Sequence, residues 1–137
     1  MSTFGRTLDL LNRAMDVGIL RDEVYANNLA NKDVPNFKRT EVNFEASLEK
    51  ALHSEDYKPA FRMARTDPRH VSNWNPMDYR KVEPRRVLDY LSTYDNDGNN
   101  VDPEDEFNKI LKNQLRYTLY AQAAAFEYGQ ISMVLRA

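Results

Sequence analysis

All six prolines of this 137-residue chain lie in its middle, between Pro35 and Pro103. Proline removes a backbone hydrogen-bond donor and clashes with the preceding helical turn, so it breaks the interior of a helix. Both ends of the chain lack proline and can therefore form long helices. The distribution predicts a mainly α fold with a helix at each end and an irregular middle. The length is that of one ordinary domain, so we expect a single domain over residues 1–137.

The N-terminal segment, 1–33, has residues at alternating spacings of four and three that follow a coiled-coil seam. The series is Phe4, Leu8, Leu11, Met15, Gly18, Asp22, Tyr25 and Leu29. Gly18 and Asp22 are weak positions in this seam. Five apolar residues lie off the series, so the helix is apolar on more than one side and needs several neighbours: Leu10, Val17, Ile19, Leu20 and Val24.

The C-terminal segment, 102–137, begins with the clearest helix start in the chain. Asp102 suits the N-cap, Pro103 fits the first helical position, and the acids at 104–106 complement the positive end of the helix dipole. A second four-and-three series follows: Phe107, Leu111, Gln114, Thr118, Ala121, Ala125, Tyr128, Ser132 and Leu135. Further apolar surface comes from Ile110, Leu115, Leu119, Phe126, Ile131 and Val134. We expect the terminal helices to pack as an antiparallel coiled coil and to finish burying their apolar faces against other subunits.

The residues between the helices are expected to form a turn, a short helix and a connector. Pro35 ends the first helix because the residue before a proline avoids the helical conformation, and Asn36 tolerates the left-handed conformation of a tight turn. A short amphipathic helix within 34–57 places four apolar residues on one face: Phe44, Leu48, Ala51 and Leu52. Residues 58–101 are predicted to be irregular or partly extended.

The formal net charge of -2 combines two opposed segments. Residues 58–86 hold eight Lys and Arg against three acids, whereas residues 87–106 hold seven acids and no base. Basic residues interleaved with aromatic ones, such as Arg62, Arg65 and Trp74, could contact nucleic acid. No recognised binding motif accompanies them, and the acids at 87–106 are alternative partners. We therefore expect no nucleic-acid partner.

Signals of catalysis or ligand binding are nearly absent. The chain has no cysteine, only two histidines in separate segments, and no glycine-rich phosphate loop. Asp95, Asp97 and Glu104 partly follow the spacing of a calcium loop, but Thr93 at its first position cannot supply a carboxylate. This departure favours a polar turn that leads into the last helix. We expect no catalytic residue, no metal, no cofactor and no small-molecule substrate.

Membrane and targeting signals are also lacking. No apolar run approaches the roughly 20 residues that cross a bilayer, and the N-terminus lacks the features of a cleaved signal peptide. If the protein leaves the cytoplasm, we expect another route to carry it.

The segment 26–39, ANNLANKDVPNFKR, contains several asparagines, whose amides compete for backbone partners and weaken a helix. It resembles the signature of bacterial flagellar axial proteins (rod, hook and hook-associated), in which the first helix ends in Ala-Asn-Asn-hydrophobic-Ala-Asn. Val34 and Asn36 depart from the threonine and glycine common there, although Asn36 still permits the turn. With its modest connector and the stretch DGNNVDPEDEFNKILKNQLRY, the chain most resembles the basal-body rod proteins of the proximal rod.

The resemblance implies a structural subunit of the proximal rod that self-assembles with copies of itself and with other rod proteins and transmits torque for motility. It also implies export through the flagellar type III apparatus without a cleaved signal peptide, a place in the periplasm-spanning rod, and contact with the basal-body base. An alternative is a soluble coiled-coil adaptor that binds a partner helix, a class with no need for this signature.

Two sets of residues are expected to serve assembly. The signature residues are Asn27, Asn28, Leu29, Asn31, Pro35, Phe37 and Lys38. The residues that the helical series assign to packing are Leu8, Leu11, Met15, Leu111, Leu115, Leu119, Tyr128 and Leu135.

Overall fold

The computed structural model describes residues 3–57, 61, 63–64, 66–67, 69–72 and 75–136. The chain divides into two compact units, one formed by residues 1–42 with 86–137 and the other by residues 43–85. Its elements, in chain order, are α1 (Thr3–Ala30), β1 (Thr40–Asn43), α2 (Glu45–Asp56), the 3-10 turn η1 (Tyr79–Lys81), β2 (Arg85–Leu88) and α3 (Pro103–Arg136). Arg62, Arg65 and Trp74, named above as possible nucleic-acid contacts, lie outside the described residues.

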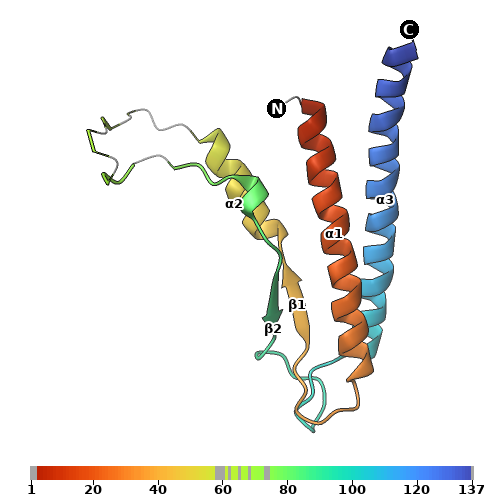
Figure 1. Ribbon diagram of the computed structural model, residues 1–137. Coiled ribbons are helices and arrows are strands. Elements are labelled where there is room, and N and C mark those ends of the chain that lie inside the picture. Colours follow the sequence, from red (N-terminus) through yellow and green to blue (C-terminus); the bar gives the residue numbers. More distant parts are fainter. Residues whose placement is uncertain are drawn as a thin grey trace. The chain divides into compact units, whose positions relative to one another are not determined.

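The two terminal helices dominate the first unit. Helices α1 and α3 lie side by side and run in opposite directions (Figure 1). This confirms the expected mainly α fold with antiparallel packing of long terminal helices. At the open end of the pair, the rings of Phe4 and Tyr128 meet edge to face, with their centroids 6.3 Å apart.

Helix α3 begins as its sequence predicts. The Oδ1 atom of Asp102 accepts hydrogen bonds from the backbone N–H groups of Glu104 at 2.9 Å and Asp105 at 3.4 Å. Pro103 occupies the first helical position, where its missing N–H costs nothing. The cap satisfies backbone donors that a helix start otherwise leaves without a partner.

Helix α1 uses two of its sides. Gly18 and Asp22, the weak positions of its seam, face α3, because both accept hydrogen bonds from the Asn113 side chain. Val17 and Val24, which lie off the seam, are buried as well. Asn28, which lies near them around the helix, bonds to the backbone of β1. Within the chain, α1 therefore contacts α3 and the backbone of β1, while Ile19 stays about half exposed. Further neighbours of this helix stay a prediction.

Helix α3 turns a different face toward α1 from the one its apolar series suggests. The buried residues of α3 are Glu106, Asn113 and Ala124, which repeat one position before the predicted series that starts at Phe107. One position rotates a side chain by about 100° around the helix axis. The face that contacts α1 is thus rotated from the expected one. It includes the polar residues Glu106 and Asn113, which apolar periodicity cannot identify.

The strand β1 was not expected from the sequence. It pairs with β2 in a two-stranded antiparallel sheet (Figure 1). Ahead of it, Asn36 has a φ of 61°, which confirms the expected left-handed turn. Its backbone N–H donates to the carbonyl of Asp97 at 3.2 Å, beside Gly98, whose φ is 83°.

The second unit is built around α2. Phe44 and Ala51 are buried, and Leu48 and Leu52 are partly buried, which confirms the expected apolar face of the short helix. The hydroxyl of Ser54 accepts the backbone N–H of Met77 at 2.7 Å and ties the later segment to the helix. Across the described parts of the chain, no helix combines the length and apolar character that spanning a bilayer requires.

The turn at Gly98 yields a first prediction. A Cβ atom there would lie 2.7 Å from Oδ1 of Asn36, on a backbone conformation that side chains disfavour. We expect Gly98→Ala to lower the free energy of unfolding by about 1–2 kcal/mol. The control is Gly129→Ala in α3, where no atom lies within 4 Å of the added Cβ and helix propensity favours a gain of up to about 1 kcal/mol. Equal effects of the two changes in denaturant titrations would contradict the assignment of the turn.

Candidate functional site

The signature segment folds against the loop that precedes α3 and against the start of that helix. We call this region the junction and define it by Asn28, Arg39, Asn99, Asn100 and Glu106. Four of these side chains are buried, although all are polar, and Arg39 is mostly covered. Buried polar groups persist only where hydrogen bonds replace water, so the partners of each decide what the junction does.

The side chain of Asn28 pairs with the outer edge of β1 in the way that a neighbouring strand would. Its Oδ1 atom accepts the backbone N–H of Thr40 at 2.9 Å, and its Nδ2 atom donates to the carbonyl of the same residue at 2.9 Å. A carboxamide presents the same donor and acceptor as a peptide group, so it satisfies the outer edge of β1. The second N–H of Asn28 reaches Oε2 of Glu106 at 3.1 Å. One side chain therefore joins α1, β1 and α3.

Asn99 closes the end of α1. Its Nδ2 atom lies 3.0 Å from the carbonyl oxygen of Asn31 and 2.9 Å from those of Lys32 and Val34. These carbonyls follow the last helical turn, where the helix itself supplies no donor. The Oδ1 atom of Asn99 accepts the backbone N–H of Val101 at 2.8 Å. The loop before α3 thus caps the helix that carries the signature.

Asn100 joins the signature to the loop after β2. Its Oδ1 atom accepts the backbone N–H of Arg39 at 2.7 Å. Its Nδ2 atom donates to the carbonyl of Asp89 at 2.6 Å and to the Ser92 hydroxyl at 3.2 Å. The neighbouring asparagines at 99 and 100 therefore hold two different segments of the backbone.

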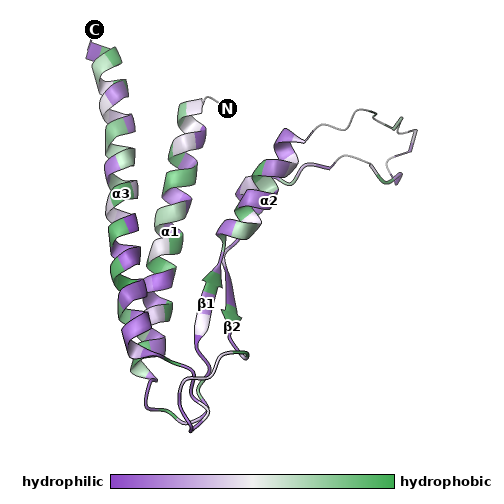
Figure 2. Cartoon of the chain, turned by 180° about the vertical axis from the view of Figure 1, so that it is seen from behind, coloured by the Kyte–Doolittle hydropathy of each residue, from purple (hydrophilic) through white to green (hydrophobic). Residues whose placement is uncertain are grey.

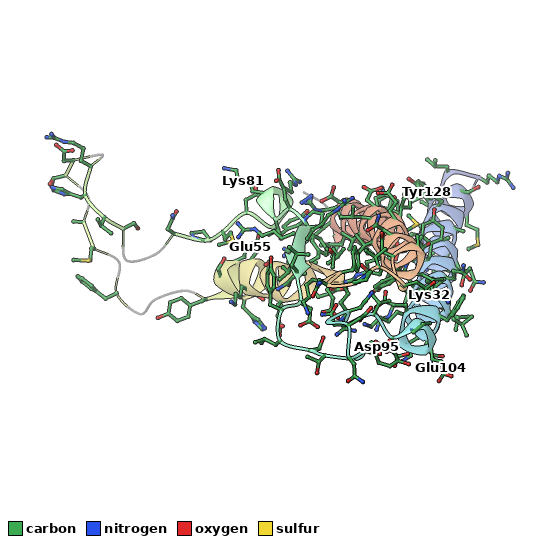
Figure 3. All side chains as sticks on the ribbon, turned by 90° about the horizontal axis from the view of Figure 1, so that it is seen from below. Lys32, Glu55, Lys81, Asp95, Glu104 and Tyr128 are labelled. Atoms are coloured by element: carbon green, nitrogen blue, oxygen red, sulfur yellow. The ribbon has the colours of Figure 1, made fainter. Side chains whose placement is uncertain are left out.

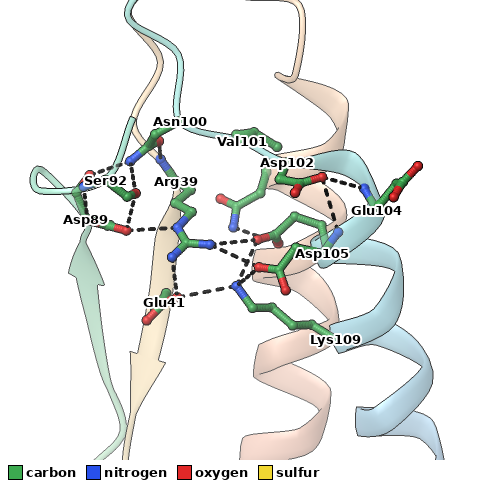
Figure 4. Close-up of polar contacts among 12 residues, drawn as sticks. Arg39, Glu41, Asp89, Ser92, Asn100, Val101, Asp102, Glu104, Asp105 and Lys109 are labelled. Carbon is green, nitrogen blue, oxygen red and sulfur yellow. Dashed lines mark hydrogen bonds and ion pairs between the residues drawn. The ribbon is translucent and has the colours of Figure 1, made fainter. Parts of the chain in front are cut away.

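Arg39 lies at the centre of an ion-pair cluster (Figure 4). Its Nε atom is 2.9 Å from Oδ2 of Asp89, and its terminal nitrogens are 3.2 Å from carboxylate oxygens of Glu41 and of Asp105. Glu106, whose side chain has no exposed surface, lies 3.9 Å away. A planar guanidinium with several fixed donors suits this arrangement, in which carboxylates approach it from different elements.

Lys109 is the second cation of the cluster. Its Nζ atom lies 2.7 Å from Asp105, 3.3 Å from Glu106 and 3.4 Å from Glu41. Burial alone would lower the pKa of Lys109, but the hydrogen bond to Asp105 and the charge of Glu106 raise it above its usual value. Lys109 therefore keeps its charge and helps to balance the buried Glu106 carboxylate.

The acids of the cluster are stabilised in their charged form. Hydrogen bonds from the hydroxyl and backbone N–H of Ser92, followed by the one from Arg39, hold the pKa of Asp89 far below its usual 3.8. The pKa of Asp105 is also lowered, first by its hydrogen bond from Lys109 and also by the charges of Lys109 and Arg39. Both carboxylates remain ionised at neutral pH.

Three acids of the segment 87–106, Asp89, Asp105 and Glu106, are thus paired with Arg39 and Lys109, which lie outside the basic segment 58–86. Asp102 is used as the helix cap. Glu104 projects outward from the first turn of α3 (Figure 3). In the described part of the chain, basic residues 69 and 86 instead pair with Asp67 and Glu23.

The turn before α3 uses its acids for backbone hydrogen bonds. Asp95 accepts the N–H of Asn96 at 2.9 Å, and Asp97 accepts that of Asn99 at 2.8 Å. Among the described residues, no group of three or more His, Asp or Glu side chains is arranged to hold a metal ion. The polar turn that leads into a capped helix is the geometry observed.

The predicted signature residues are distributed unequally. Asn28 is in the junction, Asn31 bonds to the carbonyl of Asn27 at 2.7 Å, and Lys38 donates to the carbonyl of Gly98 at 2.6 Å. The structure leaves Leu29 and Phe37 half-buried, and it exposes Asn27 and Pro35. The contacts of this set with other subunits stay a prediction.

Sequence reasoning missed four residues of the junction. Arg39 stands at the end of the quoted signature, and Asn99 and Asn100 stand in the quoted stretch before the last helix. For Glu106, the sequence predicts only a negative charge at the helix start. The available signal was the second cluster of asparagines, because asparagine side chains in turns hydrogen-bond to backbone groups.

The residues assigned to helix packing fall into two groups. Leu8 is buried, and Leu11 and Met15 are half-buried on the side of α1 that faces α3. Tyr128 meets Phe4, and Leu135 lines a groove of about 690 Å³ between the open ends of the helices. The three leucines of α3 belong to an exposed apolar row, which we call the leucine stripe: Phe107, Leu111, Leu115, Leu119, Phe126 and Met133.

The leucine stripe lies on the side of α3 that faces away from α1. Its members are 57–69% exposed and fall within about 120° of one another around the helix. Glu106, Asn113 and Ala124, which are buried toward α1, lie on the opposite side. Figure 2 shows that apolar residues recur along the whole length of α3. Within one chain, then, Leu111, Leu115 and Leu119 have no packing role.

A scan against protein-family models finds no match. Three curated proteins, each described as flagellar basal body rod protein FlgB, match nearly the whole chain. The protein of Borreliella burgdorferi is 40% identical over 136 residues, which is 99% of this chain and 100% of that protein. The protein of Borrelia hermsii is 38% identical with the same coverage. The Bacillus subtilis protein is 27% identical over 98% of this chain and 97% of its own length.

Two adjacent asparagines test the junction. Asn28→Ala leaves the N–H and carbonyl of Thr40 without their partner, so we expect it to lower the free energy of unfolding by about 2–3 kcal/mol. Asn27→Ala changes an exposed side chain in the same helical turn, and we expect an effect within about 0.5 kcal/mol. Denaturant titrations of both variants measure the difference, and a comparable loss from both would show that the contacts of Asn28 in the junction are not responsible, because Asn→Ala by itself raises helix propensity.

The lowered pKa values of Asp89 and Asp105 predict a loss of stability in acid. Carboxyls with a folded-state pKa below the unfolded value near 3.8 contribute stability that is present above that value and is lost as the pH falls below it. We expect the free energy of unfolding to fall between about pH 5 and pH 2, and Asp89→Asn to flatten this fall. Asp33→Asn, at an exposed carboxylate outside the cluster, is the control and should keep the original slope.

Proposed function

The chain belongs to the FlgB family of flagellar basal body rod proteins, and from this premise we propose that it is a non-enzymatic structural subunit of the proximal rod. In this role it assembles with copies of itself and with other rod proteins and transmits torque. Its function then depends on surfaces that join subunits and on rigid connections within each subunit.

The leucine stripe is the observation that carries this proposal. Six large apolar side chains remain more than half exposed along one side of α3. Complete burial of one such side chain is worth roughly 1.5–3 kcal/mol, so a neighbour that covers the stripe gains considerable free energy. Extended apolar patches of this kind mark interaction surfaces. Helix packing between subunits is therefore the proposed means of assembly.

The junction supports the second requirement, a rigid connection. Asn28 and Arg39 join the signature to the sheet and to the start of α3 through hydrogen bonds and ion pairs. A load applied to α3 would therefore reach α1 and the sheet without a flexible linker. A soluble adaptor that binds a single helix has no need for this connection, and nothing in the fold or the comparisons favours that alternative.

The site in the cell and the route to it follow from the same premise. We place the protein in the basal-body rod, within its periplasm-spanning part and in contact with the basal-body base. Export through the flagellar type III apparatus without a cleaved signal peptide is the proposed route. The exposed stripe fits this order of events, because its apolar side chains find their partners only when subunits meet.

The leucine stripe yields a direct test of assembly. We expect Leu115→Asp to leave folding intact, because the side chain is exposed, but to reduce incorporation into basal bodies by at least about tenfold. The physical reason is the cost of burying a charge at an apolar contact between subunits. The measurement is the amount of this protein in purified basal bodies, together with swimming in soft agar.

The matched control is Gln114→Asp, which adds the same charge one position away, on an exposed flank of α3 outside the stripe. It should assemble and swim normally. Normal motility of the Leu115→Asp strain would show that this face does not join subunits. A control as defective as Leu115→Asp would mean that the position of the charge on α3 is irrelevant.

A further inference from the structure

Helix α3 has apolar residues on two faces, and the face that packs against α1 also includes buried polar residues. The face turned to α1 includes Glu106 and Asn113, both buried. The opposite face is the leucine stripe, whose burial would also remove apolar surface from water. Apolar burial alone therefore does not select the observed orientation of α3. Specific interactions must select it.

Asn113 supplies the first such interaction. It is 5% exposed, and its Nδ2 atom donates to the backbone carbonyl of Gly18 and to Oδ1 of Asp22, both at 2.7 Å. Close distances to two acceptors on successive turns of α1 fix both the rotation of α3 and its position along the axis. Turning the stripe inward would leave the Asp22 carboxylate facing leucine side chains with no donor, a costly arrangement.

Glu106 makes a second selective contact, two turns before Asn113. Its carboxylate accepts from Asn28 of α1 at 3.1 Å and from Lys109 at 3.3 Å. Its side chain has no exposed surface, and Lys109 belongs to α3 itself, so a rotation of α3 would break the contact with Asn28 and leave the buried carboxylate without this donor. Both polar residues lie on one side of the helix and favour the same rotation.

We propose that Asn113, supported by Glu106, determines which face of α3 pairs with α1 and so reserves the leucine stripe for another rod subunit. A single buried asparagine that fixes helix register at some cost in stability is a known device in coiled coils. The inference that another rod subunit covers the stripe rests on the proposed function, whereas the choice of the face that packs against α1 is a property of the single chain. The two parts can therefore be tested separately.

The choice of face can be measured by thiol labelling, because the chain has no cysteine of its own. Gln122→Cys places a thiol on the stripe side of α3 without removing an apolar residue, and Ala124→Cys places one on the buried side. In otherwise unchanged chains, we expect a maleimide to modify the thiol at 122 at least about tenfold faster than the thiol at 124. Similar rates would show that α3 has no preferred face and would overturn the proposal.

The decisive comparison adds Asn113→Leu to each single-cysteine chain. Without the amide, the apolar stripe competes for α1, so we expect the ratio of the two labelling rates to fall severalfold or to invert. The control is Gln114→Leu, which adds the same side chain at an exposed neighbouring position and should leave the ratio unchanged. An unchanged ratio in an Asn113→Leu chain that keeps its helical circular dichroism would refute the assignment.

A second pair of variants covers the case in which Asn113→Leu does not fold. Asn113→Asp brings two carboxylates together at Asp22 and should lower the ratio. Asp22→Asn added to it restores a donor and an acceptor at that contact and should recover part of the ratio, although the carbonyl of Gly18 still lacks its donor. The absence of any recovery would also overturn the proposal. The ratio of labelling rates and the assembly test can also disagree. If the ratio responds to Asn113 as expected but the stripe plays no part in assembly, the proposed function is contradicted and the selection of the face by Asn113 is not.

Discussion

Helix α3 can bury only one of its faces against α1, and this constraint shapes the rest of the structure. The face it buries includes Asn113, whose amide reaches Gly18 and Asp22 at 2.7 Å, and Glu106, which bonds to Asn28. The opposite face keeps its leucines exposed. A subunit of a polymer gains from this arrangement, because its apolar surface is left for a neighbour.

The junction makes that arrangement rigid at the other end of the helices. Carboxamide groups there replace peptide groups: Asn28 satisfies the edge of β1, and Asn99 caps the end of α1. Arg39 and Lys109 pair with Asp89, Asp105 and Glu106, so three of the seven acids of segment 87–106 have cationic partners. The family signature is thus an internal connection at Asn28, while the exposed Asn27 beside it is available to other subunits.

The sequence allowed the larger elements of the fold to be predicted. The proline-free ends became α1 and α3, the Asp102 cap stands where its pattern placed it, and Asn36 adopts the left-handed turn. The face of α3 could not be predicted, because apolar periodicity favours leucines and ignores a buried asparagine. Strand β1 was missed because its outer edge is completed by a side chain of α1, a tertiary contact with no local pattern. The partners of Arg39 likewise come from segments far apart in the sequence.

The most direct measurement of the central claim is a reconstruction of the basal-body rod at a resolution that shows side chains. We expect the leucine stripe of each subunit to be covered by a helix of a neighbouring subunit, while Asn113 contacts Gly18 and Asp22 of its own chain. A rod in which the stripe faces solvent, or in which α3 has turned its leucines toward its own α1, would contradict this claim.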